Sequence, residues 1–81
     1  MTKEKPTEKQ IFAWMRLTKW VLLTAPQLKA TEFIKSNVTR EQLSRELFRI
    51  RNLYIKHELD RDTVFASPIW CNFKEDIDNV E

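Results

Sequence analysis

The chain has 81 residues, of which 42% are hydrophobic and 32% charged, and it contains no glycine. The length predicts one small domain, and the composition is too apolar for a disordered chain and too charged for a membrane span. The lack of glycine excludes the P-loop, the dinucleotide-binding fingerprint, the EF-hand loop and the nucleophile elbow, and it disfavours tight β-hairpins. The sequence therefore predicts an all-α fold, a compact bundle of three main helices plus a short C-terminal helix or extended segment.

The charge is spread unevenly: residues 1–56 carry +7 and residues 57–81 carry −5, which leaves a net charge of +2. This asymmetry favours a basic binding face or an acidic tail folded over it, or only complementary charge that stabilises the fold. The polar start of the chain has no apolar signal region, and the apolar-rich stretch 11–23 is shorter than the roughly 20 residues of a membrane span. The single cysteine, Cys71, cannot form an intrachain disulfide. We therefore expect a cytoplasmic protein without a membrane partner.

Residues 1–6 are predicted to form a disordered N-terminal tail, and residues 7–73 a single helical domain. The first helix is expected over residues 8–23, after a capping-box match at Thr7 and Gln10. It is apolar on nearly every side, which predicts a central helix or one that presents a second face to a partner.

The second helix is expected over residues 26–36, after another capping-box match at Thr24 and Gln27. Pro26 in the first helical position is the alternative start. Asn37 is expected to end this helix in the left-handed conformation that glycine would otherwise adopt.

The third helix is expected over residues 40–59, and it has the strongest capping box of the three, formed by Thr39 and Gln42. One side of it carries an apolar stripe made of Leu43, Leu47, Ile50 and Tyr54. This stripe predicts the face that the third helix buries.

Beyond this helix, residues 63–66 are β-prone and have no obvious partner strand, so they are predicted to be an extended connector. Ser67 and Pro68 are typical of the start of a short fourth helix that would run to about Phe73 or Ile77. Residues 74–81 hold four acids and are predicted to form a frayed C-terminal tail.

Basic side chains line the side of the third helix opposite its apolar stripe. This ridge consists of Arg45, Arg49, Asn52 and Lys56, with Arg40 and Arg51 nearby. Its cations could contact nucleic-acid phosphates while Asn52 reads a base edge. The alternative is an ordinary solvated helix face.

No motif predicts catalysis, a cofactor or a metal. His57, Asp60 and Asp62 match no established zinc spacing, and Cys71 has no nearby histidine in the sequence to activate it. We therefore expect a protein that is not an enzyme, with no catalytic, cofactor or metal site.

The aromatic residues favour a binding role. The candidate residues for a protein interface are Trp14, Trp20, Phe65 and Trp70, although at least one of these tryptophans is expected in the core. The size and composition resemble those of the small regulators and inhibitors encoded by phages and plasmids. We therefore predict a helical regulator or inhibitor that binds a protein partner; a nucleic-acid-binding transcriptional regulator and a homodimer are the alternatives.

Overall fold

Helices form most of the chain in a computed structural model, which describes residues 4–71 and 73. They are α1 (Glu8–Thr18), α2 (Thr24–Asn37), α3 (Arg40–Ile55), α4 (Arg61–Val64) and the 3-10 helix η1 (Pro68–Trp70). No strand occurs in the described part of the chain, so the prediction of an all-α bundle with three main helices is confirmed. The expected acidic tail, residues 74–81, lies outside the described residues.

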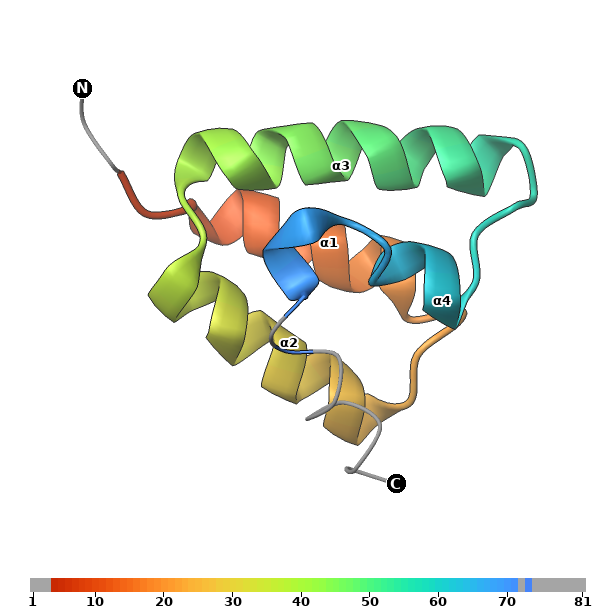
Figure 1. Cartoon of the computed structure of the whole chain (residues 1–81), viewed down its shortest axis with the longest axis horizontal. Coiled ribbons are helices and arrows are strands. Elements are labelled where there is room, and N and C mark those ends of the chain that lie inside the picture. The colour runs from red at the N-terminus through yellow and green to blue at the C-terminus, as the bar shows by residue number, and fades with distance from the viewer. Residues whose placement is uncertain (1–3, 72, 74–81) are drawn as a thin grey trace.

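The first helix is the centre of the arrangement. It packs against both α2 and α3, and η1 passes across its middle in the view of Figure 1. The neighbouring elements bury Ile11, Trp14 and Thr18 of α1, whereas Phe12 on another side of the helix stays 66% exposed.

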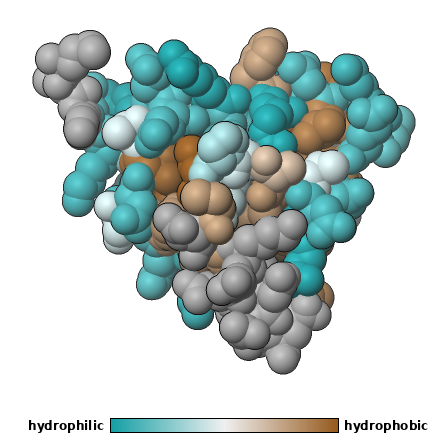
Figure 2. All heavy atoms as spheres, in the orientation of Figure 1, coloured by the Kyte–Doolittle hydropathy of each residue, from teal (hydrophilic) through white to brown (hydrophobic). Residues whose placement is uncertain are grey.

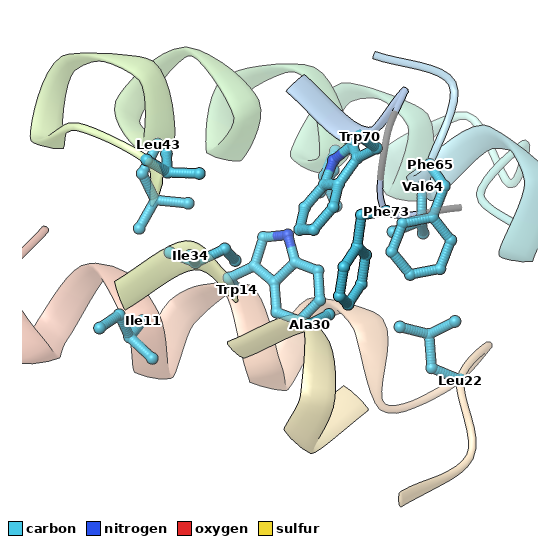
Figure 3. Close-up of a cluster of buried hydrophobic side chains, with 12 residues drawn as sticks. Ile11, Trp14, Leu22, Ala30, Ile34, Leu43, Val64, Phe65, Trp70 and Phe73 are labelled. Carbon is cyan, nitrogen blue, oxygen red and sulfur yellow. The ribbon is translucent and has the colours of Figure 1, made fainter. Parts of the chain in front are cut away.

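At the centre of the core is an aromatic cluster made of Trp14, Phe65, Trp70, Phe73 and the partly buried Phe33 (Figure 3 labels all but Phe33). The ring of Trp70 lies 5.9 Å from Trp14, 5.4 Å from Phe33 and 5.1 Å from Phe65, measured between ring centroids. These separations fall in the range where aromatic pairs attract one another beyond their area burial. The C-terminal segment therefore completes the core that α1 begins.

The first helix ends at Thr18, five residues before the predicted end at residue 23. The reason is the side chain of Gln27, whose Nε2 donates to the Met15 carbonyl at 2.6 Å and to Thr18 Oγ1 at 2.9 Å. This amide caps the last turn of α1, and the chain then turns so that Leu22 enters the core.

The capping boxes at the starts of α1 and α3 are present as predicted, but the one expected at Thr24 and Gln27 is wrong. α2 begins at Thr24 itself, with Leu23 as an N-cap that makes no side-chain hydrogen bond. The helix starts two residues earlier than predicted, and the side chain of Gln27 bonds to the end of α1 and forms no capping box.

The expected left-handed residue at Asn37 is also wrong. Asn37 belongs to the last turn of α2, and its Nδ2 donates to the Phe33 carbonyl at 3.3 Å. The described residue with a positive φ is His57, at 60°, which follows α3. This left-handed turn ends α3 at Ile55, four residues before the predicted end at residue 59.

Residues 63–66 are not the predicted extended connector. Asp60 and Thr63 form a capping box, with Thr63 N donating to Asp60 Oδ1 at 2.9 Å and Asp60 N donating to Thr63 Oγ1 at 2.8 Å. These two bonds start the short helix α4, which overrides the β propensity of the segment. The fourth helix expected from Ser67 is only the single turn η1, and the longer extension to Ile77 lies outside the described residues.

Candidate functional site

Three of the four predicted interface residues lie in the core. Trp14 and Trp70 are fully buried and Phe65 is almost so, because all three belong to the aromatic cluster. They are therefore not on the surface of this fold. Trp20 differs: it follows the end of α1 and is 67% exposed, so it is the one candidate of the four that a partner can reach.

Arg49, the centre of the predicted basic ridge, is a structural residue. Its Nη1 donates to the Thr63 carbonyl at 2.6 Å, and its Nη2 donates to the Val64 carbonyl at 2.8 Å. Nη2 also lies 2.8 Å from Oε1 of Glu46, a buried carboxylate on the same helix. The prediction that Arg49 lies opposite the buried face is wrong, because α4 docks against this side of α3 and uses its guanidinium.

The other ridge residues lie on the surface of α3 and at its ends. Arg45 pairs with Glu41 at 3.4 Å, and Arg40 holds the start of the described chain through Glu4 and the Lys5 carbonyl. Glu4 and Lys5, which belong to the predicted disordered tail, thus make contacts with α3. The remaining exposed members of the ridge are Arg51, Asn52 and Lys56.

An apolar groove of about 450 Å³ runs between α1 and α2. Ile11, Phe12 and Met15 of α1 face Leu28 of α2 across it. Phe12 is 66% exposed and Leu28 is 53% exposed, so both side chains offer apolar area to a partner. The rim of the groove is polar and includes Glu8, Thr31, Glu32 and Lys35. We name this surface the α1–α2 groove.

A second groove, of about 440 Å³, lies between α1 and α3. Its charged lining is entirely basic, and its other side chains are aromatic or small and apolar. The lining residues are Ala13, Arg16, Leu17, Lys19, Trp20, Arg51 and Tyr54. We name this surface the α1–α3 groove.

Sequence reasoning missed Phe12 and Leu28 as exposed apolar residues and Arg16 and Lys19 as lining residues of a groove. The available signal was the pattern of α1, which is apolar on more sides than two neighbouring helices can cover. Figure 2 shows that hydrophobic residues also reach the surface between hydrophilic ones on the face that it draws. Which apolar residues stay exposed depends on where the helices pack, and no local motif encodes this.

Cysteine, histidine and acidic side chains form no candidate catalytic or metal site in the described part of the chain. Cys71 is exposed and has a free thiol. No cluster of three or more histidine, cysteine or acidic side chains that could hold a metal occurs among residues 4–71 and 73. Within the same residues, no helix is both long enough and apolar enough to cross a bilayer.

Comparison of the chain with protein families, with curated proteins and with solved structures finds no match. The two grooves are therefore interpreted from their own geometry and chemistry.

Proposed function

We propose that this chain is a small, non-enzymatic, cytoplasmic regulator or inhibitor that acts by binding another protein through the α1–α2 groove. The observation that carries the proposal is the exposed pair Phe12 and Leu28, which face one another across an apolar floor inside a polar rim. An apolar centre surrounded by polar residues is the usual anatomy of a protein interface.

Phe12 and Leu28 are 66% and 53% exposed, so a partner that covers them gains part of the free energy of burying each side chain. Burying a phenylalanine or leucine side chain fully is worth about 1.5–3 kcal/mol. A few buried side chains of this kind supply most of the affinity of many complexes. Phe12 and Leu28 together can therefore anchor a partner.

The rim indicates the chemistry of the partner. Glu8 and Glu32 have no ion pair with any described residue, and Lys35 is the one basic side chain that lines the groove. An amphipathic helix that lays its apolar face in the groove and places lysine or arginine opposite the two carboxylates fits this pattern. The exposed free thiol of Cys71 supports a reducing, cytoplasmic location.

The experiment uses two variants that differ in position and match in chemistry. The groove variant is Phe12→Asp with Leu28→Asp, and the control is Phe48→Asp with Ile55→Asp, two exposed apolar residues of α3 outside the groove. Tagged protein captures partners from the cells that make it, and the purified candidate is titrated calorimetrically against all three proteins. We expect the groove variant to bind at least about 100-fold more weakly, because two anchors of about 2 kcal/mol or more are lost. The control should bind like the unmodified protein.

Equal losses in the two variants, or unchanged binding of the groove variant, would refute the proposal. Sedimentation of the purified protein tests the homodimer alternative in the same set of samples. A dimer that only the groove variant dissociates would make a second copy of the chain the occupant of the groove.

A further inference from the structure

We propose that the α1–α3 groove is a binding site for a short stretch of single-stranded nucleic acid. Arg16, Lys19 and Arg51 would contact successive phosphates, and Trp20 would stack on a base. The site is separate from the α1–α2 groove and does not depend on the function proposed there.

Helical periodicity brings the lining residues together. Ala13, Arg16, Leu17 and Trp20 recur at intervals of three and four along and just beyond α1, so they share one side of it. Arg51 and Tyr54, three residues apart on α3, form the opposite wall. Two elements distant in sequence thus place cations and aromatic rings around one hollow.

The charge of the groove favours an anion. Its three cations face no acidic side chain in the lining, and none of them has an ion pair or a side-chain hydrogen bond with a described residue. Arg45 and Arg49 differ in this respect, because each has a glutamate partner on α3. Cations without an acidic partner gain from phosphate contact through the release of counterions.

The aromatic residues favour a single strand over a free phosphate or a duplex. Lys19 Nζ lies 4.8 Å from the ring centroid of Trp20, within the range of a cation–π contact, and 67% of Trp20 stays exposed. A base that is free of its own stack can lie on such a ring, whereas the bases of a duplex already stack on one another. A basic groove with exposed aromatic rings is the common design of proteins that bind single strands.

This assignment differs from the basic ridge predicted along α3. Arg51, which lies near that ridge, lines the groove, and Arg16 and Lys19 come from α1 and its C-cap. Arg45 lies on the same helix, is exposed and lines neither groove, so it provides a control of equal charge for Arg51.

The test measures fluorescence anisotropy of a labelled oligothymidylate with the full chain and its variants. Three phosphate contacts on a single strand predict that affinity falls about 20-fold between roughly 50 and 200 mM salt. Trp20→Ala should weaken binding by about 5- to 150-fold, the loss expected for one stacked base. Arg51→Glu should weaken it clearly more than Arg45→Glu, although both change the net charge equally. Circular dichroism checks that the variants, all at exposed positions, remain folded.

Several results would overturn the proposal. These are no binding at low salt, equal losses for Arg51→Glu and Arg45→Glu, or no effect of Trp20→Ala. Thymidine monophosphate that binds as tightly as the oligonucleotide would show a nucleotide pocket instead, and inorganic polyphosphate that does so would show charge attraction alone. A duplex of mixed sequence that binds more tightly than the single strand would also refute it.

Discussion

Replacing Arg49 with methionine removes the guanidinium that joins α3 to α4 and leaves a side chain of similar length. Two carbonyls, of Thr63 and Val64, lose a charged donor in this variant. The carboxylate of Glu46, whose side chain is only 8% exposed, loses its partner as well. The variant therefore leaves these two carbonyls and the carboxylate without the hydrogen-bond donor that Arg49 provides.

The expected loss of stability follows from the burial of this pair. Removing one member of a buried ion pair costs about 3–5 kcal/mol, mostly because the other charge is left without a partner. The side chain of Arg49 is 31% exposed, so water can reach part of the site and the lower end of the range applies, about 3 kcal/mol. A chain of this size has a total stability of about 4–12 kcal/mol. The variant should therefore melt about 12–24 °C lower.

Urea denaturation followed by tryptophan fluorescence measures this loss, because the buried rings of Trp14 and Trp70 report on the core. Arg45→Met is the control: its pair with Glu41 is exposed, and such pairs contribute about 0.5 kcal/mol or less. Adding Glu46→Leu to the Arg49 variant removes the buried carboxylate that has lost its partner, so the double variant should regain part of the lost stability. A loss below about 1 kcal/mol for Arg49→Met, or no recovery in the double variant, would refute this reasoning.

Three further substitutions test other parts of the fold by the same denaturation assay. Ile50→Ala, at a fully buried position, should lower the free energy of unfolding by about 2–5 kcal/mol, whereas Phe48→Ala on the exposed side should change it by no more than about 0.5 kcal/mol. Similar losses in the two variants would mean that the buried face of α3 is wrongly assigned. Gln27→Leu should cost about 1–3 kcal/mol and speed amide exchange at residues 19–22, since it removes the cap of α1; unchanged exchange would contradict that role. His57→Gly should stabilise the chain by about 0.5–1 kcal/mol, because glycine adopts a φ of 60° without strain; a lower urea midpoint would argue against it.

Local signals predicted the fold class and the best-capped helix starts. Thr7 and Thr39 each lie three residues before a glutamine, and both form the reciprocal bonds that this spacing allows. The interaction depends only on neighbours in the sequence, so it can be recognised there. The same holds for Asp60 and Thr63, a local pair that sequence reasoning overlooked because the residues after it have high β propensity.

The predictions for Gln27 and Arg49 were wrong because each side chain bonds to residues far away in the sequence. Gln27 has the capping-box spacing that the other two glutamines have, yet it bonds to the end of α1. Arg49 lay on a basic ridge by periodicity, yet α4 returns to accept from it. In both cases a polar side chain found a better acceptor in a part of the chain that only the tertiary fold brings near.

The sequence predicted that the chain has a surface for a partner, but it did not predict which residues form that surface. The composition of α1 indicated an extra face for a partner, and the structure describes a groove on each of two sides of that helix. Tryptophan content alone could not separate core from surface, because the same large ring serves both. Trp14 lies within α1 and is fully buried, whereas Trp20 lies in the turn after α1 and is 67% exposed.

The position of the aromatic cluster determines when during synthesis this chain can fold. Trp70 and Phe73 fill the centre, and a ribosome makes them only after α1, α2 and α3 are complete. Until they emerge, Trp14 and Phe33 lack the rings that cover them, so the nascent helices expose apolar surface to chaperones and proteases. The core around Trp14 is therefore complete only after the segment that carries Trp70 and Phe73 has been made.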